Sequence, residues 1–181
     1  MSKAVMLSIH PKWCEKIING DKTIEIRKTR PNLDTPFKCY IYCTLQGCNE
    51  FFRVDLGGDV AKWNRGKWWD RKGKVIGEFT CDRIVDAWWD YVPDAITQEV
   101  EGGNLEALEG TGMTDGELFG YVGDGLRGHC YGWHISDLRI YDVPRELSEF
   151  TGLRNTKFGA EPYDIKRPPQ SWCYVEATED V

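Results

Sequence analysis

The sequence contains no long hydrophobic segment, because no apolar run approaches the roughly 20 residues that a transmembrane helix needs. Residues 1–7 also lack the apolar core of a secretory signal peptide. The seven cysteines are an odd number, and no short secreted disulfide framework surrounds them, which favours reduced thiols. These absences predict a cytoplasmic protein with no membrane association.

Motifs of several common catalytic and phosphate-binding sites are also missing. There is no Gly-x-x-x-x-Gly-Lys-Ser/Thr loop and no Gly-x-Ser-x-Gly motif, and three histidines leave little for a hydrolytic triad. The spacing of Cys39, Cys43 and Cys48 invites a zinc site. However, the first two lie about 13 Å apart along an extended strand, which is too far for one tetrahedral ion. We therefore expect no metal and no cofactor.

Charge is distributed unevenly along this chain of 181 residues, whose net charge is −6. Residues 1–30 carry seven Lys and Arg against three acids, and residues 62–83 repeat that balance. Residues 84–126 hold ten acids and neither Lys nor Arg. A protein polarised in this way can bind a polyanion on one face and repel it from another. With 41% apolar residues the chain can form a real core, and we expect a single domain, 1–181.

The opening of the chain has the pattern strand, short helix, tight turn, strand. Apolar and polar residues alternate over 5–9, as in a half-buried strand. Pro11 suits the first turn of a helix, and Asn19-Gly20 is a good helix stop because glycine adopts the left-handed conformation without penalty. The helix carries one apolar stripe, formed by Trp13, Cys14, Ile17 and Ile18.

The strand after the helix has a polar and an apolar face. Thr23, Glu25 and Arg27 share the first, and Ile24 and Ile26 share the second. Lys22 and Arg27 suit a phosphate or an oxyanion, and Glu25 suits hydrogen bonds from a base edge or, when partly buried, general base catalysis. The alternative is structural, with Glu25 and Arg27 pairing internally to hold the strand to its neighbour.

The rest of the chain favours an α+β fold that is mainly β, an antiparallel or mixed β-barrel with peripheral helices. Residues 46–73 are interpreted as an inserted loop and residues 93–126 as an acidic helical segment, in which Thr114-Asp115-Gly116-Glu117 resembles a capped helix start. Further strands are expected over 37–45, 74–85, 131–141 with a break near 136–137, and 171–176, and a helical turn over 145–150 in an otherwise irregular 144–170.

Two more segments are candidates for binding. His10 and Lys12 stand where the first helix begins, and the free N–H groups there favour an anion; the alternative for His10 is a hydrogen bond to the backbone. Residues 62–72 interleave basic and Trp side chains, as in a surface on which RNA bases stack. The alternative for this segment is a lid whose Trp side chains fold back on the barrel.

These motifs carry a family resemblance. Residues 20–27, Gly-Asp-Lys-Thr-Ile-Glu-Ile-Arg, preceded by Leu-Ser-Ile-His-Pro at 7–11, resemble the ASCH domain, a relative of the PUA RNA-binding barrel. The segments 133–135, 147–150 and 168–175 look like those of phage and bacterial ASCH proteins of similar length. The resemblance implies a PUA-like barrel whose short N-terminal helix lies against a cleft, with RNA or a modified nucleotide as the ligand. The resemblance places the motif residues and the Ser171-Trp172 segment near this cleft, although packing alone would place Trp172 in the core. Together with the residues at the start of the first helix, the expected ligand-contacting residues are His10, Lys12, Lys22, Thr23, Glu25, Arg27, Ser171 and Trp172.

Some members of the resembled family are enzymes, so a hydrolase is the alternative function. One branch removes acetyl groups from acetylcytidine with a Lys and a Thr of this motif, and another cuts RNA. The position three residues after Lys22, where that branch has its Thr, is Glu25 here, and Thr23 cannot simply replace it. Lys22 and Glu25 would then be the acid–base pair of a nuclease or nucleoside hydrolase. A third possibility is an interaction module whose acidic segment 84–126 binds a basic partner.

Overall fold

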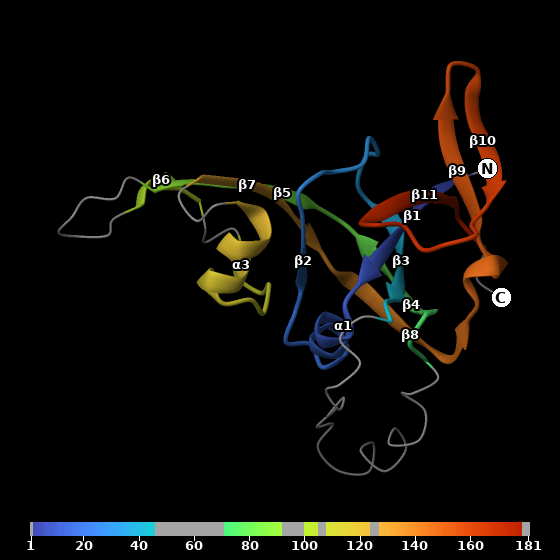
Figure 1. Ribbon diagram of the computed structural model, residues 1–181, viewed down its shortest axis with the longest axis horizontal. Helices are drawn as coiled ribbons and strands as arrows, with labels where there is room; N and C mark the ends of the chain where they lie inside the picture. Colours follow the sequence, from blue (N-terminus) through green and yellow to red (C-terminus); the bar gives the residue numbers. More distant parts are fainter. Residues whose placement is uncertain (1, 46–70, 92–99, 105–107, 124–126, 179–181) are drawn as a thin grey trace, which may run out of the picture.

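The structure is a computed structural model that describes residues 2–45, 71–91, 100–104, 108–123 and 127–178. Most of the expected insertion 46–73 and parts of the acidic segment 93–126 lie outside the described residues. The described chain is mainly β, with two mixed or antiparallel sheets and two helices, which confirms the expected fold class at that level (Figure 1). No helix among these residues is long and apolar enough to cross a membrane.

The larger sheet has seven strands in the order β10-β9-β11-β1-β3-β4-β8. Its central strand β1 runs parallel to β3 and antiparallel to β11, so the first and the last strand of the described chain lie side by side. Its strands are β1 (Lys3–Ile9), β3 (Phe37–Cys43), β4 (Lys74–Cys81), β8 (Ser136–Arg145), β9 (Thr151–Thr156), β10 (Gly159–Asp164) and β11 (Trp172–Glu176).

The smaller sheet has four antiparallel strands in the order β2-β7-β5-β6. In Figure 1 it extends away from the larger sheet, and helix α3 lies against one of its faces. Ile24 and Ile26 pack on this side in a core cluster with Trp89 and Leu118. The elements are β2 (Ile24–Arg27), β5 (Ile84–Tyr91), β6 (Val100–Gly103), β7 (Arg127–His134) and α3 (Asp115–Val122).

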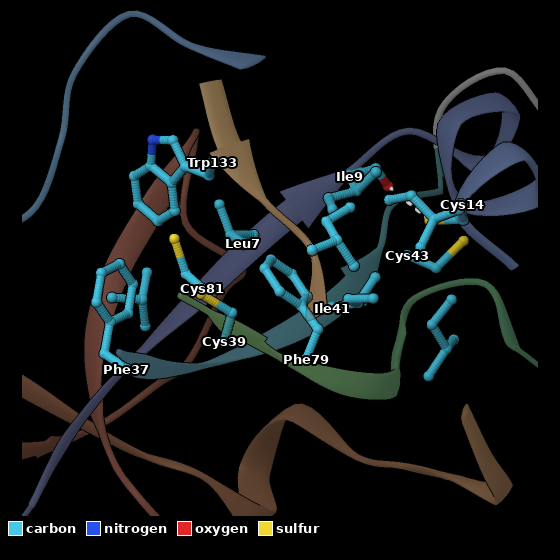
Figure 2. Close-up of a cluster of buried hydrophobic side chains, with 14 residues drawn as sticks. Leu7, Ile9, Cys14, Phe37, Cys39, Ile41, Cys43, Phe79, Cys81 and Trp133 are labelled. Atoms are coloured by element: carbon cyan, nitrogen blue, oxygen red, sulfur yellow. Dashed lines mark hydrogen bonds between the residues drawn. The ribbon is translucent and has the colours of Figure 1, made fainter. Parts of the chain in front are cut away.

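Helix α1 (Pro11–Ile18) connects the two sheets, because it follows β1 and precedes β2. Pro11 occupies its first turn, and Gly20, with φ +80°, turns the chain just after its C-cap. Cys14 and Ile17 are fully buried against the larger sheet. Figure 2 shows Cys14 beside Ile9 and Cys43 in this core, which fixes the helix over the ends of β1 and β3.

Several expected elements are confirmed and others are wrong. The helix stop at Asn19-Gly20 and the break near Ser136 are present, and Thr114 and Glu117 form the expected capping box of α3. The expected strand 74–85 is instead two strands that belong to different sheets, divided at Asp82-Arg83. The expected irregular segment 144–170 contains the hairpin β9–β10, and its helical turn is the short 3-10 helix η3 (Leu147–Glu149).

The barrel itself stays a prediction. Within the described residues the strands form two separate hydrogen-bonded sheets, with no closed ring. A core cluster that includes Trp133 of β7, Leu7 of β1 and Phe79 of β4 nevertheless packs the end of the smaller sheet against the larger one (Figure 2). The two sheets therefore share one core beside α1 and β2.

Candidate functional site

Strand β2 brings two charged side chains to the junction of the sheets. Glu25 is paired in register with Trp133 and Arg27 with Tyr131, and Trp133 lies in the core shared by both sheets. Glu25 and Arg27 are 6% and 5% exposed, so the strand carries its charges into the interior rather than to the surface. Charged groups at such depth need partners to offset the loss of hydration.

Lys22 is fixed by three oxygen atoms. Its Nζ donates hydrogen bonds of 2.8 Å to the backbone carbonyls of Ile24 and Thr111, and lies 3.4 Å from Glu25 Oε2. Burial lowers the pKa of this ammonium below its usual value of 10.5, and the nearby Glu25 carboxylate opposes that effect. Two of the three N–H donors of this ammonium are therefore bonded to backbone carbonyls, and the Glu25 carboxylate lies nearby as an ion-pair partner. These contacts fix the position of the Lys22 side chain beside the cavity.

Arg27 ties β2 to the larger sheet. One terminal nitrogen lies 2.9 Å from Glu25 Oε1 and donates to the carbonyl of Ser8 at 3.0 Å; the other donates to the carbonyl of Ser171 at 3.2 Å and to its hydroxyl at 3.4 Å. Two buried polar atoms of this cluster, Glu25 Oε2 and Arg27 Nε, have no hydrogen-bond partner among the described residues. Buried polar atoms are rarely left in this state unless water or a ligand reaches them.

A cavity of about 390 Å³ adjoins the Lys22–Glu25–Arg27 cluster. It lies between α1, β2, the end of β1 and the segment that leads into β11, with α3 on the remaining side. Its lining combines the charged cluster with aromatic, hydroxyl and amide groups, which suits a partly polar ligand. The lining residues are Ser8, Ile9, His10, Trp13, Lys22, Glu25, Ile26, Arg27, Thr44, Met113, Tyr121, Gln170 and Ser171.

Trp13 forms an aromatic wall of the cavity surrounded by cations. The ammonium groups of Lys12, Lys16 and Lys22 lie 4.7, 5.3 and 5.3 Å from its ring centroid. Lys12 also pairs with Glu117 of α3; its hydrogen bond, followed by that of the Thr114 N–H, lowers the pKa of Glu117 to about 2. These contacts hold the Trp13 ring and give its surroundings positive potential.

The structure brings five of the eight expected site residues to the cavity: His10, Lys22, Glu25, Arg27 and Ser171. His10 caps α1, with its Nδ1 accepting a hydrogen bond from the Lys12 N–H at 3.4 Å. The other three expected residues are outside the lining.

Each of those three has a different environment. Lys12 pairs with Glu117 and lies over the ring of Trp13. Thr23 is exposed, and its Oγ1 lies close to Gly110. The indole N–H of Trp172 donates to Thr29 Oγ1 at 2.9 Å, while its ring packs near Trp133. Because Thr23 does not line the cavity, the structure places no Thr of this motif beside Lys22 on the ligand side.

Sequence reasoning missed several residues of the lining. The sequence pattern places Trp13 in the apolar stripe of the first helix, and no pattern distinguishes Tyr121 or Met113 within the acidic segment. Burial raises the pKa of the Tyr121 hydroxyl, and the positive charge of Arg27 opposes that shift. The hydrophobic run Leu-Phe-Gly-Tyr-Val of α3 was the only available signal that this segment packs inward. Among the described residues, no group of His, Cys, Asp and Glu side chains is arranged to hold a metal ion.

Fold and site together define a β-rich domain with a charged cavity where a short helix meets two sheets. No family model and no curated protein matches the sequence. Two crystal structures of ASCH from Zymomonas mobilis are similar to this chain. The structure of a serine-to-alanine mutant has a TM-score of 0.56 and 16% sequence identity, and the match covers 96% of this chain and 88% of the other. The structure of the protein without that mutation has a TM-score of 0.56 and 15% sequence identity, and the match covers 96% of this chain and 87% of the other. This chain therefore has the ASCH fold, and the resemblance seen in the sequence is confirmed at the level of the fold.

Proposed function

We propose that this protein binds RNA or a modified nucleotide in the cavity beside Lys22, Glu25 and Arg27. The observation that carries the proposal is a cavity bordered by two buried cations that share a single carboxylate. The cluster therefore has an excess of positive charge, and an anionic ligand would complete it. The ASCH fold agrees with this proposal, since the family resemblance implies the same class of ligand.

The volume of the cavity limits the size of the ligand that it can accept. Its volume of about 390 Å³ is near the lower end of the range of roughly 300–1,000 Å³ for small-molecule sites. A single nucleotide, free or at a single-stranded position, fits such a space, whereas a duplex does not. The acidic residues Asp115 and Glu117 in the first turn of α3 also disfavour a long polyanion on that side.

Binding to single-stranded RNA and to nucleoside monophosphates tests the proposal. Trp13→Leu removes the aromatic wall, and we expect roughly a tenfold or larger loss of affinity, because one base stacked on an aromatic ring contributes about 1–3 kcal/mol. Trp88→Leu is the matched control, since Trp88 is 47% exposed on β5 and outside the cavity lining. Equal affinities of the two variants, with both folded by circular dichroism, would contradict the cavity as the binding site.

A salt titration separates phosphate binding from nonspecific association. Affinity should fall as salt rises, with a shallow slope for a monophosphate, because few phosphate contacts are made. The hydrolase alternative is tested in the same samples by product analysis of labelled RNA and acetylcytidine. Two backbone hydrogen bonds fix the Lys22 side chain in place, and no observation among the described residues favours turnover over binding. If the protein turns over either substrate, and Glu25→Gln abolishes this activity while the control Glu161→Gln retains it, the hydrolase alternative would replace the binding proposal.

A further inference from the structure

The hydrogen-bonding directions along β2 show which of its backbone groups face the neighbouring strand. The carbonyl of Thr23 accepts the N–H of Ile135 at 2.8 Å, and the register continues with Glu25 opposite Trp133 and Arg27 opposite Tyr131. Directly opposed residues in an antiparallel pair alternate between hydrogen-bonded and non-hydrogen-bonded. The C=O of Thr23 and the N–H and C=O groups of residues 25 and 27 therefore point toward β7, whereas the N–H of Thr23, just before the strand begins, donates to the carbonyl of Gly110 at 2.7 Å.

Residues 24 and 26 must then direct their backbone groups to the opposite side, the free edge of the sheet. Ile24 does so, since its N–H donates to the carbonyl of Gly110 at 3.1 Å and its carbonyl accepts from Lys22 Nζ at 2.8 Å. The residue of β7 opposite Ile24 shows the same alternation, because the N–H of His134 donates to the carbonyl of Arg83, on the side of β7 away from β2. By this alternation, the N–H and C=O of Ile26 point outward as well.

Ile26 lines the cavity, and the described residues supply no hydrogen-bond partner for its outward N–H and C=O. The residue is 3% exposed, so these groups have little access to bulk water. Buried backbone donors and acceptors are nearly always paired. The edge of β2 therefore presents one donor and one acceptor to whatever occupies the cavity.

We propose that the backbone N–H and C=O of Ile26 bind the edge of a planar ring that carries an acceptor next to a donor, as the Watson–Crick edge of a nucleobase does. This inference rests on the proposed function and specifies how its ligand is held. In an extended residue the N–H and C=O point the same way, which is why antiparallel residues exchange two hydrogen bonds. A base edge reproduces that exchange in a single ring.

The open part of the edge is too short for a peptide strand. Within β2, Ile24 is already bonded to Gly110 and Lys22, so Ile26 is the one residue left with outward groups to offer. Addition of a strand needs several successive backbone pairs. A ring with one donor and one acceptor matches one open residue, and it leaves Arg27 and Lys22 to balance the charge of a phosphate.

Amide hydrogen exchange measured by NMR tests this directly, with nucleoside monophosphates as probes. At saturation, exchange of the Ile26 amide should slow by at least about tenfold, as expected for a newly formed hydrogen bond. Ile24 is the matched control in the same strand, because its N–H already has a partner, and its exchange should change much less.

Methylated nucleotides test the ligand side. For uridine monophosphate, methylation at N3 blocks the Watson–Crick edge, whereas methylation at C5 leaves it intact; corresponding pairs serve for the other bases. We expect the edge-blocking methyl to weaken binding roughly tenfold to a hundredfold relative to its control. Equal binding of both derivatives with unchanged Ile26 exchange would overturn this inference and leave the proposed function standing. Failure of every monophosphate and of RNA to bind would overturn both.

Discussion

Two strands form edges of the two sheets, and their environments are opposite. β2 is buried at every residue, whereas β10 is exposed at most of its residues. At the edge of β2, the backbone of Ile24 is bonded to Gly110 and to the Lys22 ammonium, and Ile26 lines the cavity. The edge of β10 lies in solvent, where Pro162 and charged side chains disfavour pairing with another chain.

Each edge strand also carries the Glu of a Glu–Arg ion pair, and the two pairs have similar lengths; the Arg lies in β2 itself for Glu25 and in the adjacent strand β9 for Glu161. Arg27 lies 2.9 Å from Glu25, with both side chains less than a tenth exposed, and Arg154 lies 3.1 Å from Glu161, with side chains 67% and 46% exposed. Geometry alone does not distinguish these pairs. Burial does, because an interior charge that loses its partner has no water to replace it, whereas a surface charge does. The comparison teaches that the charges of β2 depend on their partners, whereas those beside β10 can be hydrated instead.

The largest expected effect comes from removing the buried carboxylate. Glu25→Ala leaves Lys22 and Arg27 as neighbouring buried cations, and we expect a loss of about 3–5 kcal/mol in the free energy of unfolding. Glu161→Ala on β10 should cost less than about 1 kcal/mol. Urea denaturation of both variants checks the contrast. Similar losses for the two would show that the Glu25 cluster is hydrated in solution.

The next effect compares a glycine in each sheet. A Cβ added at Gly128 of β7 would lie 2.0–2.4 Å from the ring of Trp89, which is 1% exposed and cannot move aside. A Cβ at Gly152 of β9 would lie 2.3–2.8 Å from the ring of Tyr163, which is 36% exposed and can rotate into solvent. We expect Gly128→Ala to destabilise by about 1–3 kcal/mol and Gly152→Ala by less. Thermal unfolding of both variants measures the difference, and a larger loss for Gly152→Ala would contradict it.

The same contrast explains what the sequence could predict. Local patterns identified β1, α1 and the Thr114 capping box, because alternation, Pro11 and a Thr–Glu spacing each act within a few residues. The hairpin β9–β10 was missed because an exposed edge strand with Pro162 has no buried face to impose alternation. The 74–85 strand was not divided, since both of its halves are apolar and only the topology assigns them to different sheets.

The sequence predicts the charged residues of the candidate site, but it does not predict which distant segments surround them. Lys22, Glu25 and Arg27 stand within six residues, so their proximity follows from the chain itself. The contacts that fix them come from distant segments: Thr111 lies 89 residues from Lys22, and Ser171 lies 144 residues from Arg27. Trp13 and Tyr121 line the cavity only because α1 and α3 pack beside β2, and no local pattern specifies that packing.

A smaller effect concerns the pair between Lys12 of α1 and Glu117 of α3. The pKa of Glu117 is lowered from 4.5 to about 2, so its pairing stabilises the fold above pH 4.5 and this contribution is lost as the pH falls toward 2. Lys12→Ala should therefore lower the free energy of unfolding by less than about 1 kcal/mol at pH 7, and this difference should disappear as the pH falls toward 2. An NMR titration should show the Glu117 pKa rising in the variant. An unchanged pKa would mean that the pair does not form in solution.

The smallest effect is expected at the tip of the β9–β10 hairpin. Phe158 is 85% exposed and contacts the neighbouring Lys157 ammonium, 4.9 Å from its ring centroid, so its replacement removes little buried area. Phe158→Ser should change the free energy of unfolding by no more than about 0.5 kcal/mol, measured at several protein concentrations. A larger loss that grows with concentration would show that the tip is covered by a second copy. In that case the β10 edge, like that of β2, would be one that the protein covers, and the contrast between the two edges would disappear.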